Sequence, residues 1–347
     1  MSLTGASPRN RAVTPVSDSF QDGWWPAGDA NPLPYTDLHE PADRFDEPTP
    51  AVMYRAGFLA ASRRAADHGA RVRLTGFGGD ELLTADPALQ LTLLRTNPRL
   101  ALHHLRLLRS AHRWGRRATL RAAFDRRSYG GWLSSLAGGL AGGRPGFDGP
   151  MLSWGPPVGL APWTTPDVRA TVARILRDHA ATATPLQEDR GLHGRLAGLH
   201  AGAASARHLA QISRRAGVTA ALPYLDDQVV EACLSVRTAD IASPRQYKPL
   251  IVRALRDVLP DELRSRSTKA DTSIAALQGA ERHRAVLLDL AERSRLAERG
   301  LIDGAALRAA VETPGDRTFY DLDQTLAAET WLRVHEAPNP GDGEQRR

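Results

Sequence analysis

The sequence predicts a helix-rich α/β protein with an incomplete parallel sheet, and three observations predict this class. A helix, a short strand, a glycine-rich turn and a second helix follow one another between residues 49 and 83. A second strand candidate at 217–223 leads into a proline and an acidic helix start. Most of the other patterns are helical, so the strands are too few for a complete parallel sheet, in which every strand needs a crossover connection.

The composition is that of an ordinary globular protein, with 347 residues of which 42% are hydrophobic. No uncharged apolar run reaches the length of about 18 residues that crosses a membrane, and the N-terminus lacks the pattern of a signal peptide. We therefore expect a cytoplasmic protein with no membrane partner. Cys233, the one cysteine, has apolar neighbours and is interpreted as a structural helix residue.

The elements of the first third are marked by their capping residues. Residues 1–40 are rich in proline, glycine, serine and aspartate, which predicts an irregular N-terminal segment. Thr49 and Pro50 suit the N-cap and first position of a helix that ends before Gly69. A strand at 72–75, a turn at 76–79 and a helix opening at 80–83 follow.

Residues 84–190 have helical patterns that are broken at Asn97-Pro98, by a glycine cluster at 138–146 and by a Trp/Pro-rich stretch at 154–163. We interpret about 91–190 as a helical insertion in a domain spanning 41–335. A disordered tail is expected at 336–347.

The region from Pro87 to Phe124 contains eight arginines and no acidic residue. Nucleic-acid or membrane binding is one interpretation of such a region. Leucines recur among the arginines, however, as on an amphipathic helix with a solvated basic face. We favour this second interpretation and exclude a nucleic-acid partner, while docking of an acidic peptide or protein stays open.

The motif Thr-Gly-Phe-Gly-Gly-Asp-Glu (75–81) has the composition of a phosphate site. It places small residues at the carboxyl end of a strand and two carboxylates, Asp80 and Glu81, at a helix start. Ligands bind at that edge of open α/β sheets, and glycines let backbone amides approach phosphate. The carboxylates suit Mg²⁺ carrying a polyphosphate. A structural turn with an acidic cap is the alternative.

Two further segments contain charged residues of interest. Pro-Tyr-Leu-Asp-Asp (223–227) follows the second strand, and there we favour a capping role for Asp226. Lys248 and Lys269 are the only lysines among 45 basic residues, which indicates sites where the larger, planar guanidinium does not substitute. Lys248 opens an amphipathic segment that we expect to be helical up to Leu259-Pro260. Lys269 lies in a loop, from which an ammonium reaching a cleft stabilises developing negative charge.

Taken in order, these motifs resemble the asparagine synthetase B family. That pattern joins a Ser-Gly-x-Gly-x-Asp-Glu loop, a Pro-Phe-Leu-Asp turn, a Lys-x-Leu-Leu-Arg helix ending in Leu-Pro, and an Arg-x-x-Lys loop. The corresponding segments here lie at 75–81, 223–227, 248–260 and 266–269. The resemblance covers roughly residues 40–335 and implies an adenine nucleotide alpha-hydrolase-like (PP-loop ATPase) synthetase domain that uses ATP and Mg²⁺ to form amides.

Finer features look like the lasso-peptide macrolactam cyclases of this family: Asp-Glu-Pro-Thr (46–49), Trp-Gly-Pro-Pro (154–157), Thr-Lys-Ala-Asp (268–271) and Ala-Glu-Thr-Trp-Leu-Arg (328–333). The implied substrate is a precursor peptide whose Asp or Glu side chain is adenylated and joined to its own N-terminus. A leader peptidase or recognition protein is an implied partner.

Site roles follow from the same resemblance, residue by residue. ATP would be bound at Thr75, Gly76 and Gly78, Mg²⁺ at Asp80 and Glu81, and Lys269 would be catalytic. Lys248 and Asp226 would give support, Lys248 as a structural ion-pair partner. Phe77 stands where the synthetases have a glutamate tied to forming aspartyl-AMP, which argues against free aspartate as substrate.

The pyrophosphate loop of the family, Ser-Gly-Gly-x-Asp-Ser, has no match upstream of Asp46. We therefore expect an N-terminally truncated member, with the loop lost from the gene model, encoded separately or supplied by another chain. Two alternatives stay open. One is a non-catalytic relic or subunit, and the other is an asparagine synthase that converts aspartate to asparagine.

Overall fold

The computed structural model describes residues 32–39, 43–141, 149–156, 158–265, 273–314 and 318–336. Within these ranges the named strands form one parallel pair, β1 (Val72–Leu74) and β2 (Thr219–Ala221), in the register Val72 to Thr219. Both strands lie within the predicted ranges. Val72 and Leu74 are 58% and 70% exposed, although parallel sheets are usually covered on both faces.

The segment before β1 folds as its capping residues predict. Thr49 accepts a hydrogen bond from the Ala51 amide and caps the 3₁₀-helix η1 (Pro50–Tyr54), which continues into α2 (Arg55–Asp67). Gly69 follows with a φ of +80°, as a residue at a helix C-terminus often has. After β1 and a short turn, α3 (Gly79–Leu83) begins at the predicted place.

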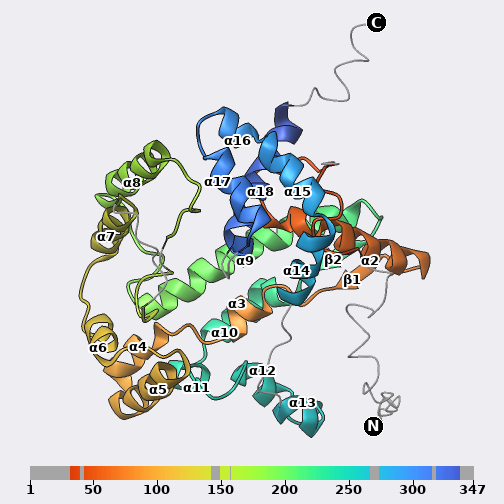
Figure 1. The fold of residues 1–347 in the computed structure, drawn as a ribbon. Coiled ribbons are helices and arrows are strands. Elements are labelled where there is room, and N and C mark those ends of the chain that lie inside the picture. The colour runs from red at the N-terminus through yellow and green to blue at the C-terminus, as the bar shows by residue number, and fades with distance from the viewer. Residues whose placement is uncertain are drawn as a thin grey trace, which may run out of the picture.

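The 25-residue helix α9 (Arg190–Arg214) crosses the molecule and packs against α2, α3 and β2 (Figure 1). Asp189 caps it by accepting from the Leu192 amide at 3.1 Å. Buried hydroxyls of Ser62 on α2 and Ser213 on α9 are 3.2 Å apart. Because β2 and α3 pack against α9 and β1 pairs with β2, this helix positions the loops that follow the strands.

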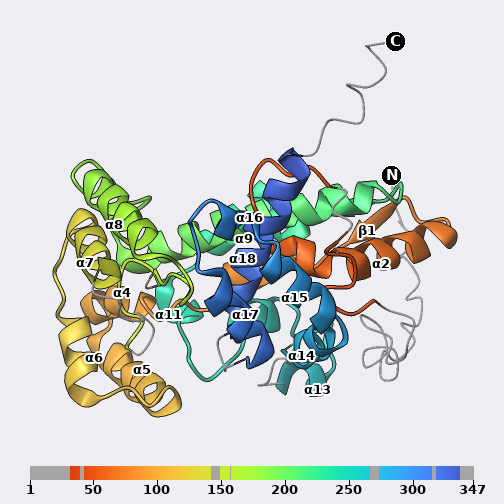
Figure 2. The ribbon, with the colours of Figure 1, turned by 45° about the horizontal axis from the view of Figure 1, so that its top comes forward.

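Five helices between α3 and α9 gather at one end of the molecule (Figures 1 and 2), in the range predicted to be a helical insertion. Asn97 accepts from the Leu100 amide at 3.3 Å and so separates the fourth helix from the fifth, as the Asn-Pro pair predicts. These helices are α4 (Leu89–Thr96), α5 (Pro98–Ala111), α6 (Arg116–Ala123), α7 (Tyr129–Ala141) and α8 (Pro166–Ala180).

The chain after β2 is helical wherever it is described. The bounds are η2 (Pro223–Leu225), α10 (Asp227–Leu234), α11 (Thr238–Ile241), α12 (Pro249–Ala254), α13 (Asp261–Ser265), α14 (Ser273–Arg282), α15 (Arg284–Glu292), α16 (Arg295–Glu298), α17 (Gly304–Glu312) and α18 (Thr318–Glu336). The prediction that this helix reaches Leu259 was wrong, because α12 ends at Ala254. Val258, in the segment beyond it, is 76% exposed and does not pack in the core.

The largest hydrophobic core joins residues 32–39 to the C-terminal helices. Tyr35 is fully buried and packs with Met53, Leu287 and Leu322, among others. Its backbone amide donates to Met53 O at 2.9 Å, and its φ of +70° turns the chain. The described part of the predicted irregular segment therefore has no helix or strand, yet contributes to the core.

The molecule is thus helix-rich with a small parallel sheet, in agreement with the predicted α/β class. Of the predicted tail, Glu336 ends α18 and the rest lies outside the described residues. Among the helices that the structure describes, none combines the length and apolar character of a membrane span. Cys233 packs in an apolar cluster with Leu82 and Leu199, and burial raises the pKa of its thiol.

Candidate functional site

The loops that follow the two strands lie against each other. The Thr75 amide extends the sheet by donating to Ala221 O at 2.9 Å. The residues that follow the two strands then pack together, with Gly78 and Gly79 against Leu225 and Tyr224. Motifs at 75–81 and 223–227 are therefore brought to the carboxyl ends of neighbouring parallel strands, the edge at which open α/β sheets bind ligands.

Gly78 is required by this packing. Its φ is +84°, and a Cβ atom placed on it would lie 2.5 Å from Leu225 Cδ2. Glycine is the residue that adopts this backbone without steric cost and leaves room for the leucine. The contact accounts for Gly78 by the fold alone, and its predicted role in binding ATP stays a prediction.

Thr75 and Gly76 differ from Gly78 in what surrounds them. The Thr75 side chain is 3% exposed, and its Oγ1 atom has no hydrogen-bond partner among the described residues. A Cβ atom on Gly76 would meet no atom within 4 Å, and the residue is exposed. An orphaned hydroxyl beside an open glycine fits the predicted contact with a nucleotide, because a buried hydroxyl normally finds an acceptor.

Asp80 is held by the segment that precedes α12. Lys248 Nζ lies 2.6 Å from Asp80 Oδ1, and the Tyr247 hydroxyl donates to the same oxygen at 2.7 Å. Lys248 therefore forms an ion pair, and its supporting role at the site stays a prediction. Sequence reasoning did not find Tyr247, although its position directly before the singled-out lysine was a usable signal.

Glu81 faces a different neighbour. Its carboxyl group lies over Gly202 of α9, where an added Cβ would come within 2.8 Å of Glu81 Cδ. Adjacent residues of a helix point about 100° apart, so Asp80 and Glu81 lie against different elements. For Mg²⁺, Asp80 fits the role of a single carboxylate ligand, since this ion is commonly held by one or two carboxylates and substrate phosphates.

The two remaining predicted residues stand apart from these contacts. Asp226 accepts a hydrogen bond from the Gln228 amide at 3.0 Å and is the N-cap of α10, which confirms the capping interpretation. Lys269, the predicted catalytic residue, lies outside the described residues.

Phe77, in place of the family glutamate, points into an apolar cluster. Its ring centroid is 5.6 Å from that of Phe58, beside Phe45 and Ile212. This position therefore offers no charged group to a substrate.

A cavity of about 210 Å³ adjoins the Asp80 contacts, and Tyr247 and Lys248 form part of its wall. Asp86 also lines it, and burial raises the pKa of its carboxyl group. The mixed polar lining of this cavity suits part of a nucleotide or peptide.

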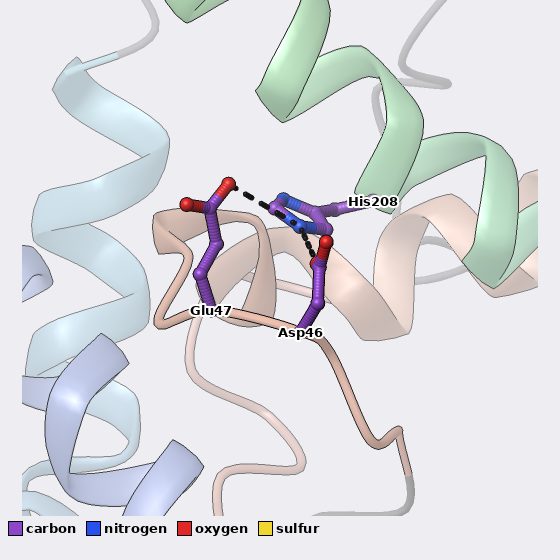
Figure 3. Close-up of side chains that lie close together, drawn as sticks. All are labelled: Asp46, Glu47 and His208. Atoms are coloured by element: carbon purple, nitrogen blue, oxygen red, sulfur yellow. Dashed lines mark hydrogen bonds and ion pairs between the residues drawn. The ribbon is translucent and has the colours of Figure 1, made fainter.

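A second polar cluster lies on α9 and the loop before η1 (Figure 3). His208 Nε2 is 3.0 Å from Asp46 Oδ1 and 3.8 Å from Glu47 Oε1, and the hydrogen bond to His208 lowers the pKa of Asp46. The three ligand atoms are close enough to hold a metal ion. Arg207 also contacts both carboxylates, at 3.1 Å and 3.3 Å, and so offsets part of their negative charge.

These observations define a class of protein: a helix-rich α/β protein with glycine-bearing and acidic loops at the ends of parallel strands. A family model described as asparagine synthase matches residues 34–333. The chain belongs to the asparagine synthase family. No curated protein and no solved structure matches it.

Family membership indicates ATP-dependent amide-bond formation as the class of chemistry. The match spans every predicted site residue, from Thr75 to Lys269. It confirms the coarse part of the resemblance seen in the motifs.

Proposed function

We propose that the protein forms a macrolactam in a precursor peptide, by activating a side-chain carboxylate with ATP and joining it to the peptide's own N-terminus. The observation that carries this proposal is the meeting of three separate motifs at one strand edge, with Asp80 bound by Lys248 and Tyr247. Family membership supports the class of reaction, and the finer motifs at 46–49, 154–157, 268–271 and 328–333 favour a peptide substrate.

The proposed chemistry has two steps. The peptide carboxylate attacks the α-phosphorus of ATP and displaces pyrophosphate, which gives an acyl adenylate. The N-terminal amine then attacks the acyl carbon, AMP leaves, and one proton is released as the amide forms. ATP is consumed to AMP and pyrophosphate, and the peptide loses one water overall.

Each residue of the site has a part in this proposal. The orphaned Thr75 hydroxyl and the open backbone at Gly76 would contact the nucleotide. Mg²⁺ would supply charge neutralisation for the phosphates, and Asp80 would hold it. Lys248 orients Asp80, and Lys269 would stabilise the negative charge that develops in both steps.

Phe77 favours a peptide over free aspartate. The ammonium group of a free amino acid is best met by a carboxylate, and Phe77, packed beside Phe58, carries none. For this reason we favour the cyclase over an asparagine synthase.

We further propose that a polypeptide not contained in the described residues supplies the pyrophosphate-binding loop, encoded upstream or by a separate gene. Support comes from β1. Within the described residues it pairs with β2 along one edge, and no strand pairs with its other edge. Its exposed Val72 and Leu74 are the kind of side chains that a further strand and its helix cover.

The test is a reconstitution. The full chain, with and without the polypeptide encoded directly upstream, is incubated with ATP, Mg²⁺ and a candidate precursor peptide. We expect a peptide that has lost one water, with AMP and pyrophosphate formed in equal amounts. Asparagine formed from aspartate and ammonia would replace this proposal with the synthase, and no turnover in any combination would favour a relic.

A matched pair of variants tests the site itself. Asp80→Asn should lower turnover by at least about 100-fold if Asp80 holds the metal. Glu81→Gln, one residue further along α3 and directed at Gly202, should have a much smaller effect. Equal losses in the two variants would contradict the assignment of Asp80.

A further inference from the structure

A cavity lies away from the candidate site, between α4, α5, α6 and the start of α9. Its volume is about 800 Å³. Both ribbon views place these helices at one end of the molecule (Figures 1 and 2). We call this space the basic cavity, after the six arginines in its wall: Arg95, Arg106, Arg109, Arg116, Arg126 and Arg190.

Most of this positive charge is not neutralised by the protein. Asp189 pairs with Arg95, and Asp125 pairs with Arg127 and lies 3.9 Å from Arg190. Arg106, Arg109, Arg116 and Arg126 form no ion pair with any described carboxylate. Glu188 is the one acidic group of the described wall that has no arginine partner.

Arg190 also has a hydrogen-bond donor without a partner. Its side chain is 11% exposed, and its Nη1 atom is buried without a hydrogen-bond partner among the described residues. Arg190 therefore leaves part of its guanidinium, a group that binds carboxylates through paired hydrogen bonds, without a partner in the wall of the basic cavity.

The wall of the basic cavity is also apolar. Leu102, Leu120 and Phe124 are 50%, 59% and 73% exposed, and all three line it. Exposed apolar side chains gathered in a concave site, rather than scattered, mark a binding surface. The solvated basic face expected from the sequence therefore includes a cavity whose wall is partly apolar.

We propose that the basic cavity docks an acidic peptide segment in which carboxylates alternate with leucine- or phenylalanine-like side chains. The carboxylates would pair with Arg106, Arg109 and Arg116, and the apolar side chains would cover Leu120 and Phe124.

The shape and lining favour a peptide over the other polyanions. A cavity of this size takes a few side chains, whereas a membrane surface does not enter it. Single-stranded nucleic acid is bound by aromatic stacking platforms along a groove, and Phe124 is the one aromatic residue of the described wall. The inference goes beyond the proposed reaction, since docking needs neither ATP nor the Asp80 site.

The test measures fluorescence anisotropy of a labelled peptide of about ten residues that alternates glutamate with leucine and phenylalanine, added to the full chain without ATP. The same peptide with glutamine in place of glutamate is the first control. We expect at least about tenfold weaker binding of the glutamine peptide. Equal binding of the two peptides would overturn the proposal.

Variants on the same two helices locate the site. Arg106→Glu with Arg116→Glu should weaken binding of the glutamate peptide at least about tenfold. Arg99→Glu with Arg121→Glu makes the same charge change on α5 and α6 outside the cavity, and should have little effect. All four side chains are exposed, so both variants should fold, which circular dichroism checks. Equal weakening by the two pairs would mean non-specific attraction and would overturn the proposal.

The apolar part has its own pair of variants. Phe124→Ser should weaken the glutamate peptide severalfold, whereas Val258→Ser, at a similarly exposed residue outside the cavity, should not. A uridine oligonucleotide of similar length is the last probe. If it binds more tightly than the peptide and is weakened by Arg106→Glu with Arg116→Glu but not by the control pair, the cavity is a nucleic-acid site and the peptide proposal is wrong.

Discussion

At the scale of single residues, the candidate site depends on contacts between parts of the chain that are far apart in sequence. The Tyr247 hydroxyl and Lys248 Nζ reach the same oxygen of Asp80 across more than 160 residues. Lys248 has a φ of +51°, a left-handed conformation that is uncommon for a residue other than glycine. A backbone held in this way at a polar cluster is typical of functional sites.

Gly78 gives a direct test of the loop geometry. Gly78→Ala should lower the free energy of unfolding by about 2 to 4 kcal/mol, because it combines a left-handed alanine with a clash against Leu225. Gly69→Ala is the matched control, since its φ is +80° and a Cβ there meets nothing within 4 Å. Urea denaturation of both variants separates the clash from the strain. Equal destabilisation would contradict the packing of Gly78 on Leu225.

Asp323 should make stability depend on pH. Burial raises the pKa of its carboxyl group from 3.8 to about 6, while the hydrogen bond from Tyr35 at 2.7 Å opposes this shift. A raised folded-state pKa means that the folded protein holds the proton more tightly than the unfolded chain. The resulting stability is present below about pH 4 and is lost as the pH rises through 6.

We therefore expect Asp323→Asn to remove part of the pH dependence. Between pH 4 and pH 7 the free energy of unfolding should fall by roughly 2 to 3 kcal/mol more in the wild-type protein than in the variant. Urea denaturation at several pH values measures this difference. The asparagine keeps an acceptor for Tyr35 but does not titrate. Parallel pH profiles of the two proteins would show that Asp323 titrates near its ordinary value.

At the scale of elements, Glu329 on α18 holds the start of α16. Its carboxylate is 3% exposed and accepts from Ser294 Oγ at 2.9 Å, the Arg295 amide at 2.8 Å and the Leu296 amide at 3.2 Å. Arg333 Nε adds a fourth donor at 2.8 Å. A buried carboxylate with this many donors replaces water at a helix N-terminus.

Removal of Glu329 should be costly because it leaves four donors without their acceptor, and two of these, the Ser294 hydroxyl and the Leu296 amide, are in buried hydrogen bonds. Glu329→Ala should lower the free energy of unfolding by about 3 kcal/mol. Glu336→Ala removes a carboxylate from the same helix that pairs with Arg299 at the surface, and should cost less than about 1 kcal/mol. Thermal denaturation of both variants is the measurement. Similar losses would show that Glu329 is not the cap of α16.

Local signals in the sequence predict several elements well. Thr49, Asn97 and Asp226 each cap the helix that their position indicates, because capping is decided within a few residues. Non-local contacts were not predictable. The contact of Tyr247 with Asp80 depends on how α12 packs against α3, and the cap that Glu329 provides depends on how α18 lies against α16.

The same limit applies to the basic cavity. Arginine and leucine spacing on α5 predicts an amphipathic helix, and buried Leu105 and Leu108 confirm it. Whether the opposite face is flat or hollow depends on where α6 and the start of α9 lie, and no local pattern contains that information.

At the scale of the whole molecule, the parallel pair of strands is a small part of the fold that positions the candidate site. It places the loops at 75–81 and 223–227 side by side, with α9 behind them. Val72 and Leu74 lie on one face of β1 and are exposed, and we propose that a helix of another polypeptide covers them. The helices α4 to α8 lie to one side, and α4, α5 and α6 form the basic cavity with the start of α9.

The central claim is that this chain contributes Asp80 and Lys269 to a site that adenylates a peptide carboxylate. ATP–pyrophosphate exchange tests it most directly, with the full chain, the upstream-encoded polypeptide, Mg²⁺ and a candidate precursor peptide. We expect exchange that requires the Asp or Glu side chain of the peptide and falls at least about 100-fold in Asp80→Asn and in Lys269→Ala. Exchange that persists in both variants, or that free aspartate supports as well as the peptide does, would contradict the claim.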